Sequence, residues 1–85
     1  MYDVTTDERS QPQIEALPTD GLAPFTEVRA SLEVVPWSTG DSLNDEYPEA
    51  PVRSVIFGAE GQGMVTYLIL EYQRRVDLPD VTWLG

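Results

Sequence analysis

The hydrophobic pattern in the last third of the chain predicts antiparallel strands. Residues 52–57 (VRSVIF) and 64–72 (MVTYLILEY) are rich in β-branched, aromatic and aliphatic residues, and the glycine-rich GAEGQG stretch between them is typical of a hairpin. Both faces of the second run are mostly apolar, which predicts a central strand covered on both sides in its middle. After a turn at 73–75, a third strand is expected over 76–84, bent or bulged at Pro79 because proline donates no ladder hydrogen bond.

A helical stripe precedes these strands. Four apolar residues recur at spacings of three, three and four, which places them on one face of a helix. They are Leu22, Phe25, Val28 and Leu32. We expect this helix to begin near Asp20, a favourable N-cap, and to end near Val34, because Pro36 disfavours helical geometry at the preceding residue. Burial of the stripe predicts a helical layer against the sheet.

Two shorter elements are expected at the start of the chain. Tyr2–Thr6 alternate in polarity, as in a short strand. A short helix follows, with Ser10 and Gln13 at capping-box spacing and an interruption at Pro18. The whole pattern predicts one α+β domain over residues 1–85, with one or two N-terminal helices packed on a small antiparallel sheet of three to four strands.

Residues 37–51 break the hydrophobic pattern and predict a long acidic surface loop. Their sequence, WSTGDSLNDEYPEAP, is rich in turn formers. The loop contains four carboxylates, at Asp41, Asp45, Glu46 and Glu49. Carboxylate oxygens are ligands for hard cations, but this spacing does not match an EF-hand loop. We therefore interpret the loop as solvated, and we expect neither a metal nor a cofactor.

Composition excludes several classes of chemistry. The chain has five arginines, no lysine and fifteen carboxylates, which give a net charge of −10, and it has no histidine or cysteine. Disulfides, thiolate metal sites and histidine-dependent nucleophilic triads are therefore impossible. An acidic chain is repelled by nucleic acid and by anionic lipid unless its few cations gather on one face. No signal-like segment or membrane-spanning run occurs, so we expect a cytoplasmic location.

The chemistry that remains belongs to arginines and tyrosines. Arg53 falls early in the first C-terminal strand, whereas Arg74 and Arg75 fall in or beside the turn after the second. The start of one strand and the end of its antiparallel neighbour meet at the same edge of a sheet, so the three side chains are placed to cluster, with Tyr67 or Tyr72 nearby. Such a cluster would bind a phosphate through guanidinium forks and stack on a base or transfer a proton through a tyrosine.

A structural interpretation competes with this one. Arg74 and Arg75 are equally well placed to pair with Glu71 and Asp77 as solvent-facing turn residues. Exposed pairs of this kind stabilise a protein by only about 0–1 kcal/mol. The sequence alone leaves both interpretations open.

The order of elements resembles the RelE/ParE toxin superfamily of type II toxin–antitoxin systems. The likeness runs from Leu17 to Leu84 and rests on a helix ending in SLEVVPW, a polar loop, VRSVIFG, a turn, MVTYLILEYQRRV and a closing VTWL. It implies a small α+β domain that an antitoxin wraps. Some members of the superfamily cut mRNA on the ribosome, and others inhibit DNA gyrase. The nucleases hold the scissile phosphate with basic residues on the sheet, and Arg53 matches a strand position that is often basic.

Two functions follow from the residues and the resemblance. The first is a toxin-like protein of a toxin–antitoxin pair that inhibits translation by mRNA cleavage, with Arg53, Arg74, Arg75 and Tyr72 as the catalytic set. The second is a non-catalytic acidic module that retains the fold and binds protein. Lysine, histidine and a tyrosine in the last ten residues are absent, and the net charge departs from that of the basic nucleases. A coherent arginine patch would favour the first function, and dispersed arginines would favour the second. In either case the expected partner is an antitoxin or another basic protein segment, because complementary potentials steer association.

Overall fold

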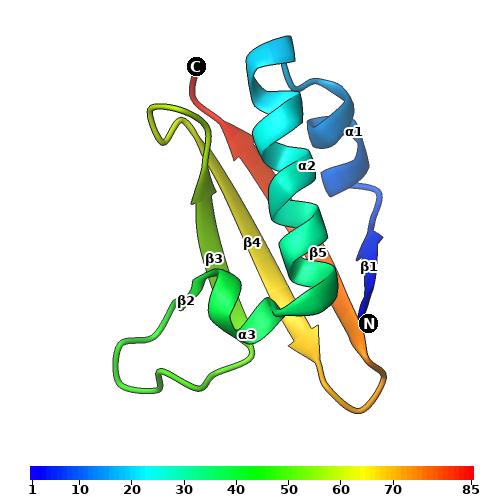
Figure 1. Ribbon diagram of the computed structural model, residues 1–85, viewed down its shortest axis with the longest axis vertical. Helices are drawn as coiled ribbons and strands as arrows, with labels where there is room; N and C mark the ends of the chain where they lie inside the picture. Colours follow the sequence, from blue (N-terminus) through cyan, green and yellow to red (C-terminus); the bar gives the residue numbers. More distant parts are fainter.

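In the computed structural model, which describes residues 1–85, five strands form a single sheet (Figure 1). The strands are β1 (Asp3–Thr6), β2 (Asp41–Ser42), β3 (Val52–Phe57), β4 (Gly63–Leu70) and β5 (Arg75–Trp83). Their order across the sheet is β1-β5-β4-β3-β2. β1 runs parallel to β5, and the other neighbours are antiparallel. The predicted meander is therefore the centre of a larger mixed sheet.

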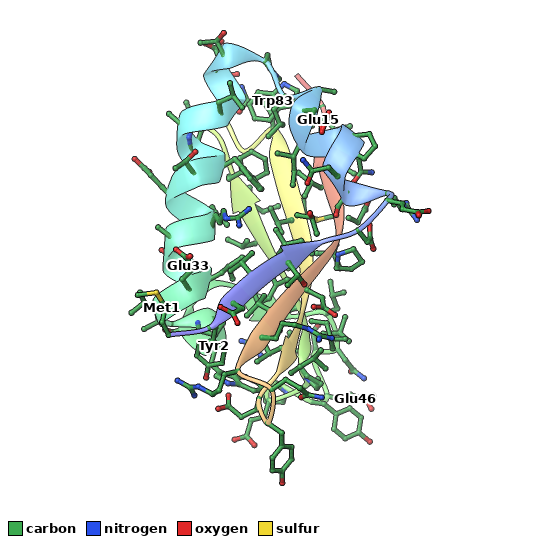
Figure 2. All side chains as sticks on the ribbon, turned by 90° about the vertical axis from the view of Figure 1, so that its right-hand side faces the viewer. Met1, Tyr2, Glu15, Glu33, Glu46 and Trp83 are labelled. Atoms are coloured by element: carbon green, nitrogen blue, oxygen red, sulfur yellow. The ribbon has the colours of Figure 1, made fainter.

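Three helices accompany the sheet, and the long one lies across it (Figure 1). They are α1 (Ser10–Glu15), α2 (Thr19–Val34) and α3 (Pro36–Thr39). Twelve apolar side chains are buried between the layers, at Tyr2, Val4, Leu17, Phe25, Leu32, Phe57, Val65, Tyr67, Ile69, Val76, Leu78 and Val81. Figure 2 shows Trp83 at the end of the sheet where α1 and α2 join, and Tyr2 at the opposite end near Glu33. The α+β class is confirmed. None of the helices has the length and apolar character that a bilayer crossing requires.

The helical stripe is confirmed in part. Phe25 and Leu32 are buried, and Val28 packs at the edge of the core. Leu22, in contrast, keeps 46% of its surface exposed. Gly21 takes the inward position, because a Cβ there would lie only 3.1 Å from the Trp83 ring. The indole thus fills the space that we had expected Leu22 to occupy.

The capping box of α1 lies three residues earlier than the sequence suggested. Asp7 accepts a hydrogen bond from the Ser10 backbone N–H at 2.9 Å, and the Asp7 N–H donates to Ser10 Oγ at 3.0 Å. This reciprocal pair satisfies two N–H groups at the start of the helix. The Gln13 side chain instead joins α1 to β5, where it donates to Asp80 and accepts from the Val81 N–H.

The prediction that the central strand is covered on both sides is wrong. Val65, Tyr67 and Ile69 of β4 point toward the helices and are buried, whereas the residues between them are half-exposed on the opposite face. No helix packs on that second face, because α2 and α3 both lie on the side of Tyr67. The outer face therefore presents an apolar surface, formed by Val52, Ile56, Met64, Leu68 and Leu70.

The predicted loop contains two short elements. α3 and β2 both lie inside residues 37–51, apart from the first helical residue, and β2 pairs with Arg53 and Ser54 of β3. The bulge expected near Pro79 is present, because the register shifts between Thr66 opposite Asp80 and Leu68 opposite Asp77.

Candidate functional site

Arg53, the best-matched phosphate ligand of the sequence analysis, is buried and binds the acidic loop. Only 6% of its surface is exposed. One terminal nitrogen donates to the carbonyl oxygens of Pro48 and Ala50, at 3.0 and 3.3 Å. The other donates to those of Trp37 and Gly40, at 3.1 and 2.9 Å. The guanidinium thus draws four backbone carbonyls of the loop onto the sheet, and it also lies 5.7 Å from the centroid of the Trp37 ring.

This arrangement leaves little of Arg53 free to bind a ligand. A guanidinium has five N–H donors, and four hydrogen bonds go to the loop. The remaining nitrogen, Nε, is buried without a partner. Carbonyl dipoles surround the charge, and no carboxylate pairs with it. Arg53 therefore acts in this structure as an anchor for the loop.

Tyr67 is a core residue whose hydroxyl bonds to the two ends of the segment from Pro36 to Gly40. Its side chain is fully buried, and its hydroxyl donates to the Pro36 carbonyl and accepts from the Gly40 N–H, both at 2.9 Å. Burial raises the pKa of this phenol. The hydroxyl is thus neutral, doubly bonded and out of reach of solvent, which is unsuited to exchanging a proton with a substrate.

Arg74 belongs to a cluster at the turn between β4 and β5. Its guanidinium donates to Glu71 at 2.8 Å and to the Tyr2 hydroxyl at 3.0 Å, and it lies 4.1 Å from the centroid of the Tyr2 ring. Glu71 also accepts from the Trp37 indole at 2.8 Å and from Tyr2 at 2.6 Å. The hydrogen bond from Trp37, followed by those from Tyr2 and Arg74, lowers the pKa of Glu71 to about 2. Through one carboxylate, the cluster joins the residue before β1, helix α3 and the turn after β4.

Arg75 lies outside that cluster. Its side chain forms an ion pair with Asp77 at 2.8 Å, and Asp77 also accepts from the Thr5 hydroxyl at 2.5 Å. Partial burial opposes ionisation of Asp77, but the bonds from Thr5 and Arg75 outweigh it and lower the pKa of the carboxyl. The alternative of ion-paired turn arginines is confirmed for both Arg74 and Arg75.

The five arginines do not form one exposed patch. Arg53 and Arg74 are linked only indirectly, since Trp37 lies beside the first and donates to Glu71, the partner of the second. Tyr72 is fully exposed in the turn. The two remaining arginines are also engaged, Arg9 with Asp80 at 3.4 Å and Arg29 with the Val4 carbonyl at 3.4 Å.

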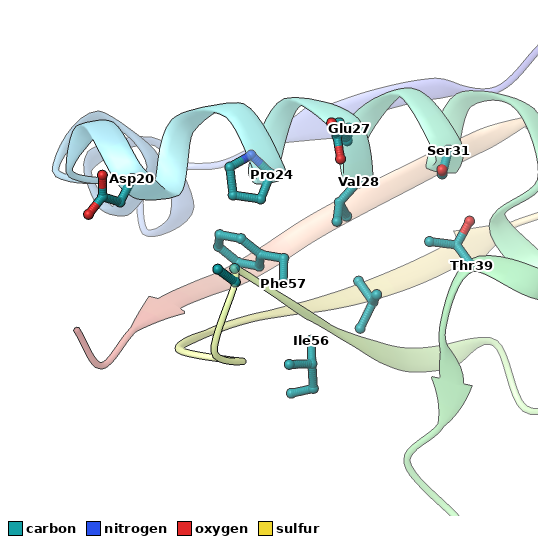
Figure 3. A pocket seen from close by; sticks show the side chains of 11 residues that line it. Asp20, Pro24, Glu27, Val28, Ser31, Thr39, Ile56 and Phe57 are labelled. Carbon is teal, nitrogen blue, oxygen red and sulfur yellow. The ribbon is translucent and has the colours of Figure 1, made fainter.

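A groove runs between α2 and the outer edge of β3 (Figure 3). It encloses about 640 Å³. The Phe57 ring of β3 lies beneath Pro24 of α2, and Asp20 and Glu27 lie on the α2 wall of the groove. No local sequence pattern indicates this groove, because the whole acidic loop separates its two walls along the chain.

Comparison with known proteins supports the fold directly. No protein-family model matches the sequence, and no curated protein is significantly similar to it. A chain in the crystal structure of the intact E. coli RelBE toxin–antitoxin complex superposes with a TM-score of 0.81 at 13% sequence identity. The match covers 100% of this chain and 99% of that chain. The resemblance to the RelE-like toxin fold inferred from the order of elements is therefore confirmed at the level of structure.

Proposed function

We propose that this chain is a RelE-fold protein-binding module that binds a basic segment of a partner protein and does not cleave RNA. The main support for the proposal is that the arginines are already bonded to other groups of the same chain. Each of the five arginines bonds to a carboxylate or a backbone carbonyl of the chain itself. A phosphate ligand would compete with these internal bonds, and it would approach a protein of the same sign of charge.

The distribution of acids also supports a basic partner. Three of the fifteen carboxylates pair with arginine, at Glu71, Asp77 and Asp80, which leaves twelve without an ion pair. The negative electrostatic field of these carboxylates slows the approach of RNA and speeds the approach of a cationic peptide. No group of three or more acidic side chains is arranged to hold a metal ion that would offset this charge.

The partner would be an antitoxin-like protein. The E. coli chain of similar fold comes from a complex of a toxin with its antitoxin. For this chain, we expect the corresponding partner to contact it through a net-basic segment, because complementary potentials set both the rate and the specificity of association. A tightly bound acidic partner would contradict this part of the proposal.

RNA cleavage remains the second candidate, favoured by the fold itself. Its residues would be Tyr72 and Arg74, in the turn after β4, and Arg75, the first residue of β5. A phosphate there would compete with Glu71 for Arg74 and with Asp77 for Arg75. Arg53 would contribute only after release of the four loop carbonyls that it now binds.

A binding comparison separates the two candidates. Fluorescence anisotropy would follow titration of the protein into a labelled arginine-rich peptide, a labelled glutamate-rich peptide of equal length, and a labelled single-stranded RNA, each at low and at physiological salt. We expect the arginine-rich peptide to bind, with affinity that falls as salt rises, and the other two not to bind. RNA binding tighter than that of the arginine-rich peptide would overturn the proposal.

A further inference from the structure

The groove between α2 and the outer edge of β3 runs along the helix. Its lining includes Asp20 in the first turn of α2 and Ser31 in the last turn, so it follows the helix for about 16 Å, at about 1.5 Å per residue. Figure 3 shows this order, from Asp20 past Val28 to Ser31. An elongated space of this kind accepts a linear ligand that lies parallel to the helix.

The floor of the groove is apolar. Phe57 is buried, whereas Pro24, Val28 and Val55 are partly exposed, and all four line the groove. The Phe57 ring lies beneath Pro24 (Figure 3). Methylene groups that cover such a floor leave water and are stabilised by the hydrophobic effect, but a hydrated ion gains nothing from it. The floor therefore favours a ligand with an aliphatic middle.

Two carboxylates stand at separate points of the groove. Asp20 and Glu27 are exposed, and neither forms an ion pair. They are two helical turns apart, so they lie on one face of α2 with their Cα atoms about 10.5 Å apart along the axis. A single metal ion, which needs its oxygen ligands within about 2.6 Å, is poorly matched to that separation. A ligand that pairs with both carboxylates must carry two cations at a similar distance.

Linear aliphatic polyamines have this chemistry. Their amines are protonated at neutral pH, because an alkyl ammonium such as that of lysine has a pKa of about 10.4. Spermidine and terminal diaminooctane have nine bonds of about 1.5 Å between their end nitrogens, which span about 11 Å when the chain is extended. Putrescine has five such bonds and spans about 6 Å. Only the longer chains match the separation of the two carboxylates.

The helix dipole ranks the two carboxylates. The N-terminal end of a helix carries a partial positive charge, and its effect falls off beyond the first turn. Asp20 lies in that first turn, whereas Glu27 lies in the middle of α2. The dipole therefore weakens the binding of a cation at Asp20 and has little effect at Glu27. We expect Glu27 to contribute more of the affinity.

We propose that the groove between α2 and β3 binds a linear aliphatic polyamine, with one terminal ammonium at Asp20, the other at Glu27 and the methylenes over Pro24, Val28 and Phe57. This site goes beyond the proposed function, because its ligand is a small molecule and not a segment of a partner protein. The binding also involves none of the arginines.

The test uses nuclear magnetic resonance of the ¹⁵N-labelled protein at physiological salt, with diaminooctane as the probe. We expect saturable shifts of the Glu27, Val28 and Gly58 amides, and nuclear Overhauser contacts between the central methylenes of the probe and the Val28 methyl groups. Putrescine carries the same charge on a shorter chain. It should bind about fivefold to tenfold more weakly, because it lacks the second ion pair and covers less of the floor. Spermidine should displace diaminooctane from the same site.

Variants test the role of each carboxylate. Glu27→Gln should weaken diaminooctane about threefold to fivefold, and Asp20→Asn about twofold, as expected for exposed ion pairs. In Asp20→Asn/Glu27→Gln, most of the preference for diaminooctane over putrescine should be lost. Glu46→Gln/Glu49→Gln is the matched control, because it changes the net charge equally in the acidic loop, and it should weaken binding less than twofold.

Three results would overturn the inference. Equal affinity for diaminooctane and putrescine, or equal weakening by the two double variants, would show diffuse attraction to the negative charge of the protein. Failure of spermidine to displace the probe would exclude polyamines from the groove. Absence of binding by diaminooctane would exclude the site itself. None of these results bears on the proposed function, which the comparison of peptides and RNA tests separately.

Discussion

Replacement of Arg53 by alanine tests whether this arginine is an anchor or a ligand-binding residue. The side chain is buried and donates four hydrogen bonds to carbonyls of the loop. Hydrogen bonds to a charged group contribute about 1.5–3 kcal/mol each. Two effects offset part of this loss. The Pro48 and Ala50 carbonyls lie in a solvent-accessible stretch and can bond to water when the loop opens. The variant also has no buried guanidinium, so the cost of desolvating that charge is absent. We therefore expect a net loss of about 3–4 kcal/mol.

Urea unfolding followed by tryptophan fluorescence measures this loss. An 85-residue domain has a total stability of about 4–13 kcal/mol, so the variant will be marginal or unfolded. With a slope of about 1.5 kcal/mol/M, the midpoint should fall by about 2 M. Arg53→Lys keeps the charge, but its single ammonium cannot reach four carbonyls, so its midpoint should lie between those of alanine and wild type.

Arg75→Ala is the matched control. It removes one arginine from an exposed pair with Asp77, and its midpoint should move by less than about 0.5 M. If Arg53→Ala changes the midpoint no more than Arg75→Ala, with an unchanged slope, Arg53 is not the loop anchor. A ligand-binding role would then have to be reconsidered, because side chains retained for binding often add nothing to stability.

Three further predictions address the region around this anchor. Tyr67→Phe leaves the Pro36 carbonyl and the Gly40 N–H without their buried partner, and thermal or urea unfolding should show a loss of about 1–3 kcal/mol. Gly40→Ala places a Cβ against the Ser54 carbonyl, where no side chain fits, and should cost about 1–3 kcal/mol; wild-type stability in this variant would refute the packing. Because the pKa of Glu71 is lowered to about 2 from its usual 4.5, its contribution to stability is complete above pH 4.5 and is lost as the pH falls toward 2. Midpoints measured from pH 6 to pH 2 should therefore fall less steeply for Glu71→Gln than for the wild type, and parallel curves would contradict this assignment.

Sequence patterns correctly predicted the helices and strands whose burial follows a regular period along the chain. The 3.6-residue spacing of Phe25 and Leu32 and the β-rich run of β4 predicted a helix over a sheet, because burial imposes those periods directly. The helical pattern gave the wrong burial for Leu22, because a residue distant in the sequence fills that part of the core. Trp83 displaced Leu22 from the core through Gly21, and no local signal connects positions 21 and 83.

The candidate site was harder to predict than the fold. The position of Arg53 in β3 was correct, but its burial depends on the loop folding back, and the spacing of charges in the sequence does not reveal that. The same holds for Glu71, whose partners Tyr2 and Trp37 come from the start and middle of the chain. The ion pairs of Arg74 and Arg75 were foreseeable because their partners are two or three residues away.

The most direct test of the account is a map of mRNA ends after induced expression of the wild-type protein and of Arg74→Ala/Arg75→Ala. Both arginines lie in exposed pairs, so the double variant should stay folded. If the protein acts by binding a basic protein segment, the two strains will grow alike and show no new message ends. New ends at ribosome-bound messages in the wild type, absent from the double variant, would contradict the account and assign nuclease activity to this turn.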